Sequence, residues 1–347
     1  MGKTQSRWRG QSKDGEEVAP ARWVQITRDQ SNPVDAKLCL VTGASAGLGR
    51  ATASRLAGME AHVVMVCRDR ARGEAARDEI KSLSKNESVD LMIADLSLLA
   101  SVRSLAAEFG AKYSKLDVLI NNVAVVLSSR TATPEGFEQM FATDYLGPFL
   151  LTRLLIPYLE AAKPSRIINV TAPSTTRPNL DDLQGERKFT SLGAFGASKA
   201  ADLLFTYALA RRLEGRGITV NAYHPGIMKT NLNRTAPTPV RLVAGLLNLF
   251  AGATPERASE ALVQFASSVQ FVDTNGQFIH GGESDNCTVH RRQRLAGESL
   301  EGQLQPRESS GNNLIVYRKK DRGRTSVHSL PSLGRIQCPL WRSHPRI

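Results

Sequence analysis

The fold is decided by the stretch Thr42-Gly43-Ala44-Ser45-Ala46-Gly47-Leu48-Gly49, which joins an apolar run to a segment with helical spacing. Glycines at such a junction permit a tight turn, let a phosphate approach the backbone, and let the helix pack close to the strand. The N–H groups at the start of the helix then face an anion. The glycine spacing is G-x3-G-x-G, not the common G-x-G-x-x-G. Alone, the turn therefore fits either a dinucleotide site or a merely tight connection.

Outward from this turn, short apolar runs alternate with longer segments whose apolar residues recur every three to four positions. Strands buried on both faces and alternating with helices are typical of a doubly wound parallel sheet. The predicted fold class is α/β, a Rossmann doubly wound parallel sheet in a single domain with flexible N- and C-terminal extensions. The predicted strands are 38–41, 62–67, 90–94, 117–120, 166–170 and 218–223, with a last strand over 271–280 that is broken at 274–276. The predicted helices are 49–58, 71–84, 97–113, 136–160, 197–213 and 256–269.

Length and charge divide the chain of 347 residues into three parts. Residues 1–36 are polar without periodicity and are predicted to be a mobile leader, residues 37–282 the folded domain, and residues 283–347 a basic, disordered extension. The net charge of +12 divides into +1, +5 and +6 over these parts, so half of the basic excess lies in the extension. Its aromatic residues, Tyr317 and Trp341, are too few for a base-stacking platform. A solvated extension is therefore favoured over a nucleic-acid module.

Several classes of protein are excluded or disfavoured by composition. With 41% hydrophobic residues the chain can bury a core, which excludes a fully disordered or collagen-like protein. The four cysteines lack metal-site spacing, so no metal is predicted, and Cys39 and Cys67 lie in apolar runs typical of the core. No stretch reaches the roughly 18 apolar residues of a membrane span, and we expect a cytoplasmic protein.

Polar residues follow the predicted strands at the sheet edge where ligands bind in doubly wound folds. Arg68 follows the second strand, where a guanidinium suits the 2′-phosphate of NADP better than the free hydroxyl of NAD, although it also fits a solvated strand-end arginine. Asp95 follows the third strand, and Asn121-Asn122 the fourth. These residues fit either ligand contacts or Asx turns.

The ordered motifs of residues 37–282 together resemble the short-chain dehydrogenase/reductase family, and residues 197–232 look most like its retinol dehydrogenase-like branch. The resemblance implies a nicotinamide cofactor and hydride transfer to or from a carbonyl or alcohol. The motifs are TGASAGLG at 42–49, ADLS at 94–97, NN at 121–122, DYLGPF at 144–149, SK at 198–199 and HPG at 224–226.

The residues that the resemblance assigns to proton transfer depart from the family pattern. The family places a tyrosine one helical turn before its lysine; here the lysine is Lys199 and the tyrosine position is Phe195. A phenyl ring cannot transfer a proton. The family's serine position is Ala172, for which Thr171 and Ser174 are candidate substitutes, and the asparagine that supports a proton-relay water is Asp144.

The same resemblance implies a set of cofactor contacts, and Arg68 favours NADP(H) as the cofactor. His224 carries an imidazole of suitable ordinary pKa, but a structural role is favoured over a catalytic one. The apolar segment 237–253 fits either a cover over a lipophilic ligand or an ordinary packing or dimer helix. The implied cofactor contacts are Gly43, Ser45, Gly47, Leu48, Gly49, Arg68, Asp95, Leu96, Asn122, Lys199, Pro225, Gly226 and Thr230.

The sequence thus predicts an NADP(H)-binding protein of oxidoreductase descent whose ordinary hydride transfer is impaired. Losing general acid–base help costs about 10²- to 10⁴-fold in rate. Two alternatives stay open: an active NADPH-dependent oxidoreductase on a lipophilic carbonyl or alcohol that uses substitute groups, and a non-redox catalyst or binding protein on the same scaffold. By resemblance, the helices containing 146–159 and 200–213 would pair the chain into a homodimer or homotetramer.

Overall fold

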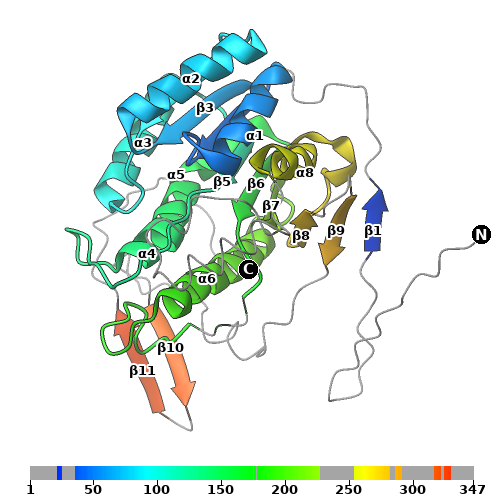
Figure 1. Ribbon diagram of the computed structural model, residues 1–347. Coiled ribbons are helices and arrows are strands. Elements are labelled where there is room, and N and C mark those ends of the chain that lie inside the picture. The colour runs from blue at the N-terminus through cyan, green and yellow to red at the C-terminus, as the bar shows by residue number, and fades with distance from the viewer. Residues whose placement is uncertain are drawn as a thin grey trace, which may run out of the picture.

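A central sheet has the strand order β1-β9-β8-β7-β6-β5-β2-β3-β4 (Figure 1). The computed structural model describes residues 22–25, 36–174, 176, 178–226, 254–281, 286–290, 316–321 and 324–329. The strands from β8 to β4 run parallel, whereas β9 pairs antiparallel with β8 and with β1. The parallel strands are β2 (Leu38–Thr42), β3 (His62–Cys67), β4 (Val89–Ile93), β5 (Val118–Asn121), β6 (Ser165–Val170), β7 (Ile218–His224) and β8 (Phe278–Gly281).

The other strands come from the parts of the chain predicted to be extensions. They are β1 (Arg22–Gln25), β9 (Asn286–His290), and the hairpin of β10 (Val316–Asp321) with β11 (Arg324–Ser329). The boundaries at residues 36 and 282 stay predictions.

Two helical layers cover the parallel sheet. One side chain cluster joins one face of the sheet to α1 (Gly47–Gly58), α2 (Arg70–Ser84) and α8 (Pro255–Ser267). A second cluster joins the other face to α3 (Leu99–Lys112), α5 (Gly147–Ala162) and α6 (Ser191–Arg212). The parallel strands are buried on both faces, as continuous apolar runs such as 38–41 require. The predicted doubly wound parallel sheet is confirmed, and the first six predicted strands agree within one residue at each end.

Three predicted elements differ from the structure. The helix predicted over 136–160 is the short α4 (Gln139–Phe141), a π-helical turn at Ala142–Leu146, and then α5. The helix predicted over 197–213 begins at Ser191, because Thr190 caps it by accepting from the backbone N–H of Gly193. The glycines in its first two turns weaken the helical pattern there.

The strand predicted over 271–280 is also wrong in its first half. A 3₁₀ turn at Val269–Phe271 packs the Phe271 ring against Phe265, with ring centroids 5.0 Å apart. The Asn275 side chain then accepts from the backbone N–H of Val220 at 2.9 Å, so the chain turns before pairing begins at β8.

The two middle strands, β2 and β5, are joined at their carboxyl ends by Thr42 and Asn122. The backbone N–H of Asn122 donates to the Thr42 hydroxyl, and its amide nitrogen donates to the Thr42 carbonyl, both at 2.9 Å. Gly43 turns away with φ +67°, and Gly47 begins α1 with φ +56°. A Cβ at Gly49 would collide with the Gly43 carbonyl and the Asn122 amide. The turn therefore holds strand, helix and loop in direct contact.

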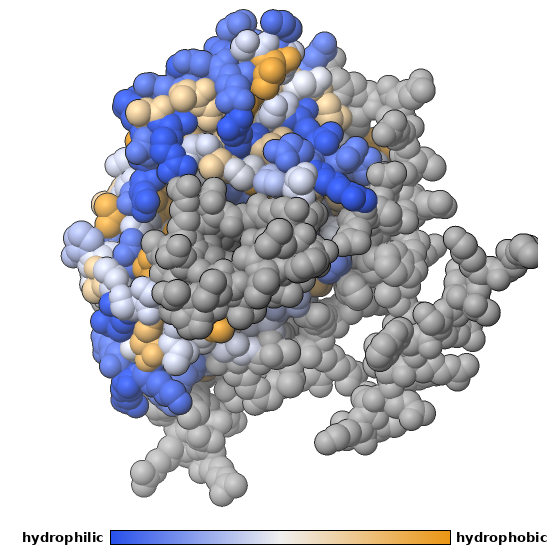
Figure 2. Space-filling model, viewed as in Figure 1, coloured by the Kyte–Doolittle hydropathy of each residue, from blue (hydrophilic) through white to orange (hydrophobic). Residues whose placement is uncertain are grey.

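The described surface carries few large apolar side chains. Figure 2 shows a mostly hydrophilic face over α1 and α2. Leu83, Leu192 and Val269 are the large hydrophobic residues exposed within the described ranges, and they lie on separate elements. No helix among the described residues is both long and apolar enough to cross a bilayer.

We expect Gly49→Ala to lower the free energy of unfolding by about 2 kcal/mol, because the added methyl group meets the Gly43 carbonyl and the Asn122 side-chain amide, and hydrogen bonds to Val66 and Thr42 hold these two residues in place. Gly58→Ala is the matched control: it lies at the end of the same helix, with open space around its added Cβ. That variant should stay within about 1 kcal/mol of the parent. Chemical denaturation measures both, and equal effects of the two substitutions would contradict this account of the turn.

Candidate functional site

The glycine-rich turn leaves the start of α1 open to an anion. Ala46 precedes the helix and makes no side-chain hydrogen bond to its first turn. A Cβ at Gly47 would meet nothing within 4 Å, so this side of the turn faces open space. Uncapped N–H groups beside an open backbone fit the phosphates of a dinucleotide.

Two other residues of the turn have side chains that are buried or half-buried. Leu48 is buried in the core cluster that contains α1. The half-buried Ser45 hydrogen-bonds the thiol of Cys67. Burial raises the pKa of Cys67 to about 11 despite this bond, and raises that of Cys39 to about 12. Both cysteines are buried, free and protonated, as predicted for core residues.

The arginine predicted to recognise a 2′-phosphate is exposed at the end of β3. Asp69 follows Arg68 and caps α2, where its carboxylate accepts from the backbone N–H of Arg72 at 2.9 Å. Asp69 is thereby engaged by the helix, whereas Arg68 is exposed at the end of the strand. The local structure thus presents a cation at this position.

The polar residues after β4 and β5 make turns and junctions. The Asp95 carboxylate accepts from the backbone N–H and the hydroxyl of Ser97, at 2.9 and 2.7 Å, which is the Asx turn. Leu96 is buried in the core, and Asn122 joins β5 to β2. Asn121 is buried and donates to Thr152 and Asn169. These four side chains organise the edge of the sheet.

The residues assigned to proton transfer meet on α6. The Lys199 ammonium lies 2.9 Å from a carboxylate oxygen of Asp202, one turn later on the helix. The same ammonium lies 5.8 Å from the centre of the Phe195 ring, one turn earlier. Lys199 and Asp202 are 3% and 6% exposed. Burial lowers the pKa of Lys199, but the carboxylates of Asp202 and Asp144 outweigh it and hold that pKa above its ordinary value.

Asp144 approaches this pair from the π-helical turn. Its carboxylate accepts from the backbone N–H of Val125 at 2.8 Å and from the Ser198 hydroxyl at 3.5 Å. Burial, partly offset by Lys199, raises the pKa of Asp144 to about 7, and burial raises that of Asp202 to about 6. Two carboxylates and one ammonium are therefore enclosed together.

The candidate substitutes for the family's serine have their hydroxyl groups engaged. Thr171 donates to the carbonyl of Lys199 at 3.3 Å, and Ser174 donates to the carbonyl of Gly196 at 2.7 Å. The loop can approach α6 this closely because residue 196 is glycine. A Cβ at Gly196 would lie only 2.5 Å from the hydroxyl of Thr176 in the same loop. Ala172 lies between them, partly buried. The loop after β6 is thus fastened to α6 by the hydroxyl groups that could have replaced the missing one.

His224 ends β7 near this loop. Its Nδ1 lies 3.2 Å from the Thr171 carbonyl, and its ring lies 5.0 Å from that of His280. Burial and His280 lower the pKa of His224 to about 4, so the imidazole is neutral at pH 7 and Nδ1–H donates to the carbonyl. Pro225 and Gly226 follow, Gly226 with φ +80°. Thr230 and the segment 237–253 lie outside the described residues.

Sequence reasoning missed Asp202. The available signal was its spacing: an acid three residues after a lysine shares its helix face. Because the surrounding residues are apolar, that pair had to be buried together. His280 was also missed, since it becomes adjacent to His224 only through the parallel pairing of β7 with β8.

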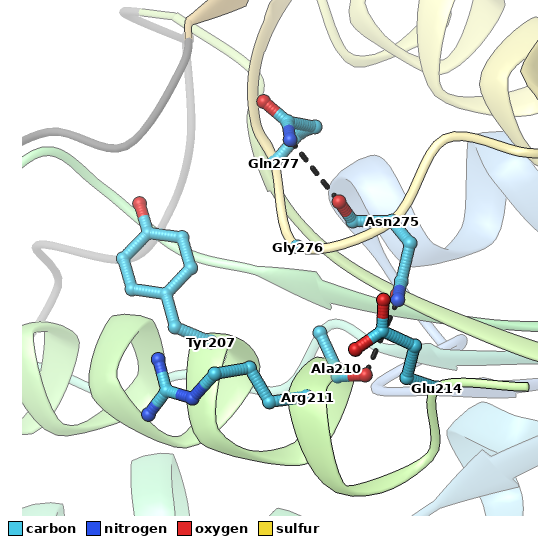
Figure 3. A pocket seen from close by; sticks show the side chains of 7 residues that line it. All are labelled: Tyr207, Ala210, Arg211, Glu214, Asn275, Gly276 and Gln277. Carbon is cyan, nitrogen blue, oxygen red and sulfur yellow. Dashed lines mark hydrogen bonds between the residues drawn. The ribbon is translucent and has the colours of Figure 1, made fainter.

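A pocket of about 290 Å³ lies away from these residues (Figure 3). It is formed between the last turns of α6 and the loop before β8, where Asn275 donates to the Ala210 carbonyl at 3.2 Å. This is the amino-terminal edge of the sheet, opposite to the edge where doubly wound folds bind ligands. Among the described residues, no three metal-ligating side chains are grouped to hold a metal ion.

Comparison with known proteins agrees with this geometry. Residues 37–240 match the family model described as short chain dehydrogenase. The chain is 38% identical to retinol dehydrogenase 14 of Homo sapiens over 276 residues, which are 74% of this chain and 82% of the relative. It is 40% identical to retinol dehydrogenase 12 of Homo sapiens over 273 residues, 76% and 86% of the two chains.

Solved structures with a similar fold also match the chain. An uncharacterised protein from Mycobacterium Paratuberculosis has a TM-score of 0.61 and 29% identity, covering 77% of this chain and 90% of that one. The Pseudomonas aeruginosa RhlG/NADP active-site complex has a TM-score of 0.57 and 25% identity, covering 73% and 98%.

The parallel sheet, the glycine-rich turn and the helix that carries Lys199 all agree with these matches. The family is one of NAD(P)-dependent oxidoreductases. The chain belongs to the short chain dehydrogenase family, within its retinol dehydrogenase-like branch.

Proposed function

We propose that this chain binds NADP(H) and that the family's hydride transfer between the cofactor and a carbonyl or alcohol is impaired. One observation carries the proposal: the Lys199 ammonium is paired with Asp202 at 2.9 Å and lies beside the phenyl ring of Phe195. The cofactor-binding edge is preserved around a proton-transfer centre that has lost its phenol.

The residues at the sheet edge fit a dinucleotide. The uncapped N–H groups of α1 and the open backbone at Gly47 would hold the pyrophosphate, and Arg68 the 2′-phosphate. Similarity to the RhlG/NADP complex supports a nicotinamide dinucleotide, and the exposed Arg68 favours NADP over NAD. When bound, the cofactor supplies or accepts a hydride. The remaining proposed contacts are Gly43, Ser45, Leu48, Gly49, Asp95, Leu96, Asn122, Lys199, Pro225, Gly226 and Thr230.

The protein's own residues cannot complete the proton transfer in the family's way. A phenyl ring at position 195 has no proton to give, and Ala172 has no hydroxyl to hold a substrate oxygen. His224 is neutral and donates to a backbone carbonyl, so it is not an acid at pH 7. Thr171 and Ser174 donate to carbonyls of α6. These contacts favour impairment over an active enzyme with substitute groups, and a binding or non-redox role remains compatible.

The ligand class follows from the relatives. Retinol dehydrogenases 12 and 14 are named for a lipophilic alcohol. The apolar segment 237–253 is the part of this chain suited to cover such a ligand. We therefore assign a lipophilic small molecule as the second ligand; a homodimer or homotetramer and a cytoplasmic location stay predictions.

Isothermal titration calorimetry tests the proposal. NADPH should bind the full chain below millimolar concentration. Turnover of retinal and of simple aldehydes should lie at least about 100-fold below ordinary enzymatic rates of 1–10³ s⁻¹. Absence of binding at millimolar NADPH overturns the binding half, and ordinary turnover overturns the impairment.

Arg68→Ala should weaken NADPH binding by about 10- to 100-fold, because a charge-assisted contact to the 2′-phosphate is lost. NADH, which lacks that phosphate, should bind the variant and the parent alike. The matched control is Arg70→Ala, an exposed arginine two residues later that lies 3.6 Å from Glu74. An equal loss for NADPH and NADH would show that Arg68 does not read the 2′-phosphate.

Phe195→Tyr combined with Ala172→Ser should raise carbonyl reduction by at least about 100-fold over the parent, because a phenol and a hydroxyl return to the site. Adding Asp202→Asn should raise it further, because the lysine is then released from its carboxylate partner. Phe195→Leu with Ala172→Ser is the control that repacks the site without a proton donor. If that control gains as much activity, the missing phenol is not the cause of the impaired carbonyl reduction.

A further inference from the structure

The site encloses more acid than base. We define the acid-rich cluster as Asp144, Lys199 and Asp202, which are 1%, 3% and 6% exposed. Lys199 contacts Asp202 directly at 2.9 Å, and its charge also acts on Asp144. With all three groups ionised, the cluster carries two negative charges and one positive charge. A buried site with an uncompensated negative charge favours either a proton or a cationic ligand.

Among the described residues, the groups that act on the cluster do not supply the missing positive charge. Glu138, which caps the start of α4, has its carboxylate engaged by the backbone N–H groups of Met140 and Phe141, and it adds to the negative potential at Asp144. The neutral amide of Asn169, on β6, donates to the Thr206 hydroxyl, which in turn donates to the backbone carbonyl of Asp202. The described neighbours on α6 and after β6, Ser198 and Thr171, are hydroxyls.

A nicotinamide cofactor exists in two forms that differ in charge at one place. The oxidised ring carries a positive charge, whereas the reduced ring is neutral; the phosphates and the adenosine are the same in both. A comparison of the two forms therefore isolates the effect of charge near the ring. This step rests on the proposed function and on the family resemblance, which implies that Lys199 holds the ribose of the nicotinamide.

We propose that the acid-rich cluster makes this site selective for the redox form of its cofactor, favouring the oxidised, positively charged nicotinamide over the reduced one. Asp144 and Asp202 act as specificity-determining residues, since each contributes one of the two buried negative charges. The neutral asparagine that the family pattern places at position 144 would leave no excess charge. The protein then binds preferentially to NADP⁺ and responds to the ratio of the two forms.

The selectivity depends on pH with a definite sign. The pKa of Asp144 is raised to about 7 and that of Asp202 to about 6, so the cluster takes up a proton as the pH falls through this range. Protonation removes the excess negative charge. The preference for NADP⁺ should therefore be full near pH 8 and decline toward pH 6. Binding of NADP⁺ near pH 7 should release protons, because the cationic ring stabilises the ionised carboxylate.

Calorimetry on the full chain measures the dissociation constants of NADP⁺ and NADPH at pH 6, 7 and 8. We expect NADP⁺ to bind about tenfold more tightly than NADPH at pH 8, the order of magnitude for one net charge in a partly buried site. Repeating the pH 7 titration in buffers of different ionisation enthalpy measures proton release, which should accompany NADP⁺ and not NADPH.

Substitutions of aspartate by the isosteric asparagine change the net charge of the cluster one unit at a time. Asp144→Asn and Asp202→Asn each leave one carboxylate against one ammonium, and each should bring the two affinities to within about threefold of each other. The double variant leaves the ammonium alone and should reverse the preference. Glu87→Gln, on the exposed end of the α2–β4 connection, removes a distant charge and should change nothing. Circular dichroism and thermal unfolding confirm that each variant is folded.

The outcomes separate the two proposals. If both cofactor forms bind the parent with equal affinity at every pH, the redox selectivity is wrong and the cofactor site stands. If NADPH binds more tightly than NADP⁺ at pH 8, the cluster does not favour the oxidised cofactor and the proposed redox selectivity is wrong. If neither form binds at millimolar concentration, the proposed function fails, and the selectivity fails with it. A preference that survives in both single variants shows that the cluster is not its source.

Discussion

The close approach of α1 to the ends of β2 and β5 is the constraint on which the rest of the site depends. Gly49 leaves no room for a Cβ between the Gly43 carbonyl and the Asn122 amide. Asn122 in turn holds both the backbone and the hydroxyl of Thr42. Because the crossover helices leave these two neighbouring strands in opposite directions, their carboxyl ends form an open edge. The uncapped start of α1 lies at that edge.

The opposite half of the site shows how a buried charge constrains its neighbours. An ammonium that is 3% exposed needs a partner, and in this chain Asp202 provides it. The phenyl ring of Phe195 lies beside this ammonium, and the hydroxyls of Thr171 and Ser174 fasten the neighbouring loop to α6. Asp144, Phe195 and Asp202 thus all lie beside, or act on, the one buried ammonium of Lys199.

Particular elements show what the sequence could predict. The six strands from 38–41 to 218–223 were predicted within one residue, because continuous apolar runs between turns are a local signal. The start of α6 was missed, since its first turns contain glycines and are stabilised by the Thr190 cap and by contact with the loop after β6. The π-helical turn that presents Asp144 was also missed, because it joins α4 to α5 and packs against α6, which lies far away in the sequence.

In the candidate site, too, some features follow from the sequence and others depend on tertiary packing. By itself the sequence determined the doubly wound sheet, the glycine-rich turn and the absence of a phenol and a hydroxyl at Phe195 and Ala172, since these follow from residue type and local spacing. Only the tertiary structure decided that the hydroxyls of Thr171 and Ser174 are engaged by α6, and that Asp144 comes close enough to act on Lys199. The physical reason is that a hydrogen bond or ion pair between separate elements depends on how the elements pack, and burial then decides how strongly the charges act on one another.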